Sequence, residues 1–123
     1  MYEYKAKVIS VTDGDTIRLD IDLGFSIIMR NTPVRLLGIN APEISTPEGV
    51  VSKTYLKELL PLGTSVTLQS HKDKSEKYGR ILGTIMVKSG DTAAPLHKRI
   101  VVDGNINNHM VSKGYAVPYM TTT

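Results

Sequence analysis

Residues 16–23 alternate strictly between apolar and polar side chains, and this period of two constrains the fold more than any other feature of the chain. The apolar positions are Ile17, Leu19, Ile21 and Leu23, and the polar positions between them are Arg18, Asp20 and Asp22. Such a pattern predicts a strand with one buried and one exposed face. Residues 4–11 predict a preceding strand, and Asp13-Gly14 between the two runs is a tight-turn signal. We therefore expect the chain to begin with a β-hairpin.

Further turn signals divide the rest of the chain into short strands. Gly24 separates residues 16–23 from residues 25–30, and Asn31-Thr32-Pro33 separates the latter from residues 34–39. Four strands in a meander are therefore expected before residue 40. Later strand-like runs cover residues 64–70, 81–88 and 100–102, with a polar loop at 71–79 and an excursion rich in glycine, proline and charge at 89–99.

One main helix is expected between these groups of strands. Ser45-Thr46-Pro47-Glu48 has the form of a capping box, in which Ser45 caps the helix start and Glu48 reaches back to it. Proline is tolerated in such a first turn. The helix should run to Leu60, because Pro61 follows and cannot continue it.

A shorter second helix is expected at residues 105–113, closed by Gly114 in a left-handed conformation. Residues 115–120 should pack back against the body. Together these elements predict a mainly β domain with helices (α+β), namely a five-stranded OB-like β-barrel with one main helix and a short C-terminal helix. Residues 1–123 should form this single domain, because their number suffices for one hydrophobic core and is too small for two.

The composition limits the classes of protein and of site. Fifteen Lys and Arg against twelve Asp and Glu give a net charge of +3, a mild bias toward polyanions that many non-binding proteins share. The absence of cysteine excludes disulfides and thiolate metal sites, and three separated histidines lack the spacing of zinc ligands. No run approaches the roughly 20 apolar residues of a membrane span, so we expect no membrane partner.

The start of the chain bears on its location. It opens directly on a strand pattern, so we expect this chain to carry no signal peptide. Two locations are therefore expected. The first is the cytoplasm, for a protein of a cell or of a phage, and the second is outside the cell, for a secreted protein whose signal peptide has been removed. A monomer is expected.

Arg35 and Arg80 are candidates for binding phosphate. Arg35 interrupts the apolar run from Val34 to Ile39, and Arg80 follows Gly79 at the start of a strand. Hydrolysis of a phosphodiester needs cations around a phosphorus centre with developing negative charge, and a guanidinium donates two parallel hydrogen bonds to phosphate oxygens. Taken singly, each arginine could equally point into solvent.

Three acids complete the group of candidate residues. Asp15 directly follows a glycine turn and could supply the hard oxygen ligand that calcium prefers, whereas Asp13 is interpreted as a turn residue that accepts backbone hydrogen bonds. Glu43 follows Pro42, so its carboxylate is presented from a loop just after the strand that carries Arg35. A general base needs such a position, although a surface acid near a helix start is the alternative.

Three blocks of sequence carry a resemblance to a known family. They are Val11-Thr12-Asp13-Gly14-Asp15-Thr16, Val34-Arg35-Leu36-Leu37-Gly38-Ile39-Asn40-Ala41-Pro42-Glu43 and Glu76-Lys77-Tyr78-Gly79-Arg80. In order and spacing they resemble the staphylococcal nuclease (thermonuclease) family, over roughly residues 5–116. The resemblance implies an OB-like barrel and a calcium-dependent nuclease that cleaves DNA and RNA, with nucleic acid as its partner.

The resemblance also implies roles for the matching residues. Asp15 matches a calcium-binding aspartate, and Glu43 matches the proposed general base. The two phosphate-binding arginines of the family correspond to Arg35 and Arg80. Ala41 falls where the family offers a backbone carbonyl to calcium, a role that does not depend on the side chain.

Asn40 departs from the family pattern, which has a second calcium-binding aspartate at this position. The amide keeps an oxygen but loses the charge, which should weaken calcium binding. Two alternatives follow. The chain is a calcium-assisted phosphodiesterase with Asp15, Asn40 and the Ala41 carbonyl as ligands, or it is a barrel that binds nucleic acid or protein without cleaving it, as inactive members of the family do.

The remaining matches lie in loops and near the C-terminus. Lys77 and Tyr78 match residues that contact the terminal phosphate of a bound nucleotide, although in a polar loop they could equally be solvated. Asn107 matches an asparagine at a helix start, for which we expect a structural role. Tyr115 and Tyr119 fall near a substrate-contacting tyrosine of the family and are interpreted as packing residues.

Overall fold

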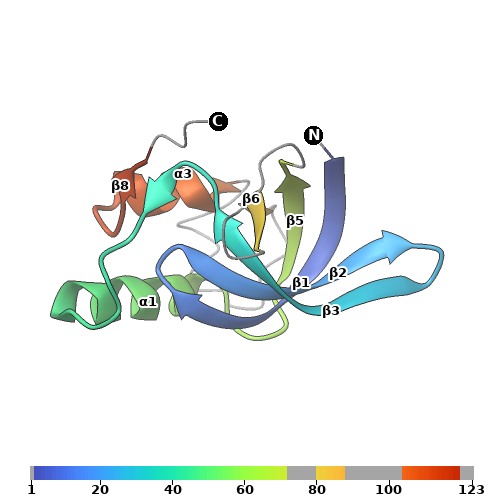
Figure 1. Cartoon of the computed structure of the whole chain (residues 1–123), viewed down its shortest axis with the longest axis horizontal. Coiled ribbons are helices and arrows are strands. Elements are labelled where there is room, and N and C mark those ends of the chain that lie inside the picture. The colour runs from blue at the N-terminus through green and yellow to red at the C-terminus, as the bar shows by residue number, and fades with distance from the viewer. Residues whose placement is uncertain (1, 72–79, 88–103, 120–123) are drawn as a thin grey trace.

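A computed structural model describes residues 2–71, 80–87 and 104–119 of the protein. Its strands are β1 (Tyr2–Asp13), β2 (Thr16–Gly24), β3 (Ile27–Leu36), β4 (Ile39–Asn40), β5 (Ser65–Ser70), β6 (Ile81–Val87), β7 (Gly104–Asn105) and β8 (Val117–Pro118). Its helices are α1 (Pro47–Leu59) and α3 (Ile106–Ser112). Figure 1 shows α1 and α3 on one side of the molecule, with the long β2–β3 hairpin extending from the other.

Five strands close into a barrel. They are hydrogen-bonded in the order β3-β2-β1-β5-β6, and β6 then pairs with β3 to complete the ring. All neighbours are antiparallel except β3 and β6, which are parallel. Full closure removes unpaired strand edges, which small β proteins otherwise have to protect. The predicted five-stranded OB-like barrel with one main helix and a short C-terminal helix is confirmed.

The core occupies the inside of the barrel and the space between it and the helices. Its largest fully buried side chains are Ile17, Leu19, Ile21, Leu36, Leu56, Leu60, Leu68, Ile85, Ile106 and Met110. The alternation of residues 16–23 thus predicts the buried face of β2 correctly as far as Ile21. Leu23 is 38% exposed, because the pairing of β2 with β1 ends at Ile21.

The strand boundaries before residue 40 differ from the prediction. Residues 25–30 and 34–39 were expected to be separate strands, but β3 runs without interruption from Ile27 to Leu36. A bulge absorbs the irregular stretch: Asn31 takes a left-handed φ of 49°, and its N–H donates to the carboxylate of Asp20, 2.8 Å away. Pro33 stands opposite Arg18 within the ladder. Only Ile39–Asn40 forms a further strand, which pairs with β8.

The start of α1 also differs from the prediction. Thr46, not Ser45, is the N-cap, and its hydroxyl accepts a hydrogen bond from the N–H of Gly49 at 3.0 Å. The predicted capping box is therefore wrong by one residue. Moving the cap to Thr46 puts Pro47 at the first helical position, where its missing N–H leaves nothing unpaired.

The described residues cover part of the second half of the chain. The strand at 64–70 is confirmed with its start shifted by one residue, the strand at 81–88 is confirmed over Ile81–Val87 with residue 88 outside the described residues, and the second helix is confirmed as α3. Gly114 follows it with a φ of 82°, as the left-handed closing position requires. The predicted strand at 100–102, the excursion at 89–99 and all but His71 of the polar loop lie outside the described residues. No helix among those described is long and apolar enough to cross a membrane.

Candidate active site

The turn between β1 and β2 brings two aspartates to one edge of the barrel. Asp13 ends β1, and Asp15 follows in the turn with its N–H 3.2 Å from Oδ1 of Asp13. A Cβ at Gly14 would collide with Ser52 of α1 and with Ala41. Glycine at this position therefore lets the turn lie directly against the helix and against the segment after β4.

Arg35 reaches from β3 to the carboxylate of Asp15. Its Nη1 lies 3.0 Å from Oδ2 of Asp15, and the two side chains are only 13% and 10% exposed. The backbone holds the two residues in place, because the N–H of Leu36 donates to the carbonyl of Asp15 at 2.8 Å. The pairing of β2 with β3 thus places an arginine and an aspartate in contact across 20 positions of sequence.

The segment after β3 adds Asn40 and Ala41 to this pair. Nη2 of Arg35 donates to Oδ1 of Asn40 at 3.3 Å, so one guanidinium bridges an aspartate and an amide. The N–H of Ala41 donates to Oδ2 of Asp15 at 2.8 Å. The structure therefore brings the three residues predicted as metal ligands to one place, with the Ala41 contact made by its N–H.

Asp13 and Asp15 differ in how readily they ionise. Burial, followed by the hydrogen bond and the charge of Asp15, raises the pKa of Asp13 to about 6. Burial also acts to raise the pKa of Asp15, but hydrogen bonds with Asp13 and with the Ala41 N–H, and the charge of Arg35, outweigh it and lower this pKa below its usual value. Asp13 is thus the first of the two to take up a proton as the pH falls, while Asp15 stays ionised.

Arg80 joins the site through Thr16. It directly precedes β6, whose parallel pairing with β3 brings it near the first arginine. Nη1 of Arg80 donates to Oγ1 of Thr16 at 3.2 Å, and this hydroxyl donates to Oδ1 of Asp15 at 3.1 Å. A chain of hydrogen bonds therefore links Arg80, through Thr16 and Asp15, to Arg35.

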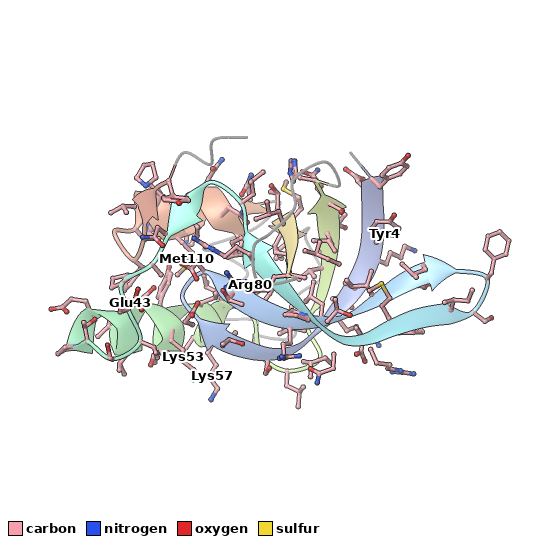
Figure 2. The ribbon with its side chains drawn as sticks, viewed as in Figure 1. Tyr4, Glu43, Lys53, Lys57, Arg80 and Met110 are labelled. Atoms are coloured by element: carbon pink, nitrogen blue, oxygen red, sulfur yellow. The ribbon has the colours of Figure 1, made fainter. Side chains whose placement is uncertain are left out.

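Glu43 lies on the connection between β4 and α1, beside the first turn of the helix (Figure 2). Its carbonyl accepts hydrogen bonds from the N–H of Thr46 at 2.9 Å and from the Thr46 hydroxyl at 2.7 Å. A Cβ at Gly49 would collide with the same carbonyl. The backbone at Glu43 is therefore clamped by the helix start, while its side chain is exposed and makes no hydrogen bond or ion pair with other described residues.

Sequence reasoning missed two neighbours of the site. Asp13, interpreted as a turn residue, also contacts Asp15 as an acid with a raised pKa. Tyr119 is 48% exposed, and the Cζ atom of Arg35 lies 6.0 Å from the centre of its ring. Its interpretation as a packing residue is therefore wrong, whereas Tyr115 does pack, stacked on Tyr55 at 4.0 Å.

The position of Tyr119 depends on a pairing that no local pattern indicates. β8 pairs with β4, and the N–H of Tyr119 donates to the carbonyl of Gly38 at 2.8 Å. This carries the C-terminal segment to the end of β3, where Arg35 lies. Lys77 and Tyr78, predicted to bind substrate, lie outside the described residues.

The oxygen donors of the site are suited to a hard cation. Within residues 2–71, 80–87 and 104–119 no three histidine, aspartate or glutamate side chains gather as a metal group. The donors near Asp15 are its own carboxylate, that of Asp13 and the amide of Asn40. Such ligands fit calcium better than zinc. The pKa of Asp13 is raised first by burial and then by the hydrogen bond and the charge of Asp15, and a bound cation would act in the opposite direction.

The fold and the site together define a small OB-like barrel with two arginines around an acidic turn. Residues 33–123, more than half of the chain, match the family described as "Staphylococcal nuclease homologue", and the chain belongs to this family. It is 30% identical over 128 residues to Endonuclease YhcR of Bacillus subtilis (strain 168). It is 31% identical over 117 residues to Protein ParB of Escherichia coli.

Both relatives are longer than this chain. Each alignment covers 95% of the chain, but only 9% of Endonuclease YhcR and 58% of Protein ParB. The chain therefore spans less than two thirds of either relative.

Proposed function

We propose that the chain is a calcium-dependent nuclease domain that hydrolyses phosphodiester bonds in DNA, RNA or both. The observation that carries this proposal is the placement of Arg35, which holds Asp15 and Asn40 with one guanidinium while Arg80 joins the same hydrogen-bonded chain. Two arginines beside ionised and amide oxygens form a site for a phosphate together with a cation. Acting alone as a monomer, the domain would contain every group required.

The two arginines would bind the phosphate that is attacked. Each guanidinium stays charged at any relevant pH and can donate two parallel hydrogen bonds. Arg35 is already oriented by Asp15 and Asn40, so little reorganisation is needed when charge develops on the phosphate oxygens. Lys77 and Tyr78 would contact a further phosphate of the substrate.

Glu43 would accept the proton of the attacking water. As the water oxygen forms its bond to phosphorus, the water proton passes to the Glu43 carboxylate, and the bond from phosphorus to the leaving sugar oxygen breaks while that oxygen takes a proton from solvent. The exposed carboxylate is free to meet a water molecule, and the helix start fixes the backbone that carries it. Gly49 supports this role indirectly, because only glycine fits against the Glu43 carbonyl.

Calcium would be held by Asp15, Asn40 and the backbone carbonyl of Ala41, and Asp13 is close enough to Asp15 to assist. Bound at these oxygens, calcium would polarise a phosphate oxygen and lower the pKa of its bound water. With an amide at position 40, the protein offers one carboxylate fewer than a site with aspartate there. Substrate phosphate would supply part of the missing charge.

A second candidate function is supported by the same amide. A barrel with a weakened metal site could bind nucleic acid or protein without cleaving it. Against this alternative, the structure keeps Arg35, Arg80 and Asp15 in one hydrogen-bonded chain, which a purely binding module has no evident need to maintain.

Cleavage of fluorescent single-stranded DNA across a calcium titration tests the proposal, with a chelator as the blank. Glu43→Gln should lower turnover by about 100-fold or more, because it removes the proton acceptor but keeps the shape. Glu48→Gln is the matched control, since Glu48 is an exposed acid in the first turn of α1 and should retain full turnover.

The outcomes separate the two functions. Calcium-dependent cleavage that is lost in Glu43→Gln and kept in Glu48→Gln supports the nuclease. Binding of the DNA without cleavage at millimolar calcium would favour the non-catalytic module. Equal turnover in both variants would remove Glu43 from the mechanism.

A further inference from the structure

The β2–β3 hairpin carries an unusual concentration of exposed apolar side chains. Twelve large hydrophobic residues are exposed in the described part of the chain, and five of them lie between positions 23 and 29. These five are Leu23, Phe25, Ile27, Ile28 and Met29. Figure 1 shows this hairpin projecting beyond the barrel, away from α1 and α3. The apolar residues are therefore gathered on one protruding element.

Phe25 at the hairpin tip is unfavourable for the folded domain on two counts. Its side chain is 98% exposed, so it adds no packing. Its backbone has a φ of 54°, a left-handed conformation that is rare for a bulky residue, and asparagine or glycine would adopt it at lower cost. The flanking Gly24 and Ser26 are also left-handed, so three successive residues of the turn have a positive φ. A contact with a ligand would offset both disadvantages.

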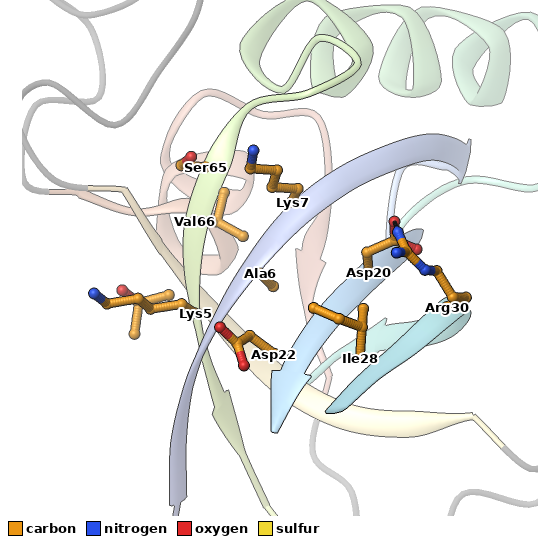
Figure 3. Close-up of a pocket in the computed structure, with 10 residues that line it drawn as sticks. Lys5, Ala6, Lys7, Asp20, Asp22, Ile28, Arg30, Ser65 and Val66 are labelled. Carbon is orange, nitrogen blue, oxygen red and sulfur yellow. Dashed lines mark hydrogen bonds and ion pairs between the residues drawn. The ribbon is translucent and has the colours of Figure 1, made fainter. Parts of the chain in front are cut away.

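A hollow of about 600 Å³ adjoins the hairpin on the outside of the barrel. It is lined by Lys5 and Lys7 of β1, by Arg30 and Ile28 of β3, and by acidic residues of β2 (Figure 3). Ile28 belongs both to this hollow and to the exposed apolar group, so the two features are continuous.

The charges in the hollow favour an anion. Asp20 pairs with Arg30 at 3.0 Å, and Oδ1 of Asp22 accepts the N–H of Gly24 at 2.8 Å, so both acids are occupied within the hairpin. The Arg30 side chain remains 74% exposed despite its pair. Lys5 and Lys7 lie on the opposite side of the hollow in Figure 3. Three cations against two acids leave one positive charge in excess beside the apolar tip.

We propose that the β2–β3 hairpin is a second binding site for single-stranded nucleic acid, in which Phe25 stacks on an unpaired base and the hollow with Lys5, Lys7 and Arg30 receives phosphates. This proposal rests on the proposed function, since a nucleic-acid strand bound at the hairpin would follow β3 to Arg35 at the candidate active site. Stacking of a base on an aromatic ring combined with cations along the backbone is the general mode of single-strand binding.

The length of β3 determines which substrates can use both sites. From Ile27 to Arg35 the strand spans about 26 Å at roughly 3.3 Å per residue. A stacked strand with 3.4 Å between nucleotides needs about eight nucleotides to cover this distance. An oligonucleotide of four nucleotides therefore reaches one site only, whereas one of twenty reaches both.

Phe25→Asn is the test variant, because asparagine accepts the left-handed backbone and removes the ring. The ratio of kcat/KM for a 20-nucleotide DNA to that for a 4-nucleotide DNA should fall on the order of tenfold. Leu62→Ser, which changes another exposed apolar residue far along the chain, should leave this ratio unchanged. An unchanged ratio in Phe25→Asn would overturn the proposal.

Phe25→Trp provides a readout that does not depend on cleavage. The chain contains no tryptophan, so the new ring is the single indole fluorophore. With chelator present, the 20-nucleotide DNA should quench its emission and bind with the affinity of the parent protein, while Phe25→Asn should bind about tenfold more weakly by anisotropy. If the DNA quenches the emission but is not cleaved in calcium, the hairpin site is supported and the proposed nuclease activity is rejected.

The rival occupant of the hairpin is a second copy of the chain. Sedimentation velocity of the parent protein and of Phe25→Asn detects it directly. A parent dimer that becomes monomeric in Phe25→Asn, together with equal DNA affinities, would assign the apolar tip to self-association and overturn the nucleic-acid site.

Discussion

Arg35 of β3 and Asp15 of the β1–β2 turn form an ion pair with 3.0 Å between Nη1 and Oδ2, although they belong to different blocks of sequence. Because both side chains are largely shielded, the guanidinium is oriented before any ligand arrives. A phosphate or a cation that enters the site must extend or exchange this pair. Changes of charge around the pair should therefore alter ligand binding and turnover more than they alter the fold.

Arg35→Lys should lower kcat by about 100- to 1,000-fold while the protein remains folded. Lysine keeps a positive charge beside Asp15 but cannot bridge to Asn40 and a phosphate with a planar fork. Steady-state kinetics on a short oligonucleotide measure the effect, and circular dichroism checks the fold. Arg18→Lys on β2 is the control and should keep kcat; a loss of the same size there would show that the effect is not specific to Arg35.

Asn40→Asp should tighten calcium binding by about tenfold, because an additional carboxylate strengthens a site built from oxygen ligands. Isothermal titration calorimetry with calcium measures this directly in the absence of substrate. Asn108→Asp adds the same charge on the exposed side of α3 and serves as the control. Equal affinity in Asn40→Asp and in the parent would place the metal site elsewhere.

Asp13→Asn should stabilise the metal-free protein at pH 8 but not at pH 4. A carboxyl whose pKa rises from 3.8 in the unfolded chain to about 6 in the folded one contributes stability below pH 4, and this contribution is lost as the pH rises through 6. Asparagine does not ionise, so this loss does not occur in the variant. After allowance for solvent screening, we expect its free energy of unfolding at pH 8 to exceed that of the parent by about 1 kcal/mol.

Urea unfolding in chelator at the two pH values measures this difference. Asp22→Asn, at the exposed end of β2, is the control for loss of a surface charge. A gain for Asp13→Asn that is the same at pH 4 and pH 8 would contradict the assigned titration.

Asn107→Ala should destabilise the domain by about 2–4 kcal/mol. The buried amide accepts from the N–H of Ile85 at 3.1 Å and donates to the carbonyls of Leu37 and Gly83 at 2.9 and 3.1 Å. Its removal deprives the N–H of Ile85 and the carbonyl of Leu37 of this partner, while the Gly83 carbonyl still accepts from the N–H of Leu37. The hydrogen bonds that join α3 to β6 through this amide are lost. Thermal unfolding measures the change, with the exposed Asn108→Ala expected within about 0.5 kcal/mol of the parent.

Local patterns predict the elements that depend on neighbouring residues. The alternation in residues 16–23 predicts β2, and Gly24 and Gly114 mark real left-handed positions. Local patterns fail where two signals in neighbouring residues compete. Asn31-Thr32-Pro33 resembles a turn, but the pairing of β2 with β3 accommodates it as a bulge inside one strand. Ser45 and Thr46 are both suitable caps, and the preference of Pro47 for the first helical position selects Thr46.

The amino-acid order alone was sufficient for the family resemblance, the barrel with two helices and the residue types that the candidate site contains. The tertiary structure alone decided that Arg35 bridges Asp15 and Asn40, that Asp13 has a raised pKa, and that Tyr119 reaches Arg35. The physical reason is that period and turn signals act over a few residues. Contacts between distant segments depend on strand register and barrel closure, which are properties of the whole domain.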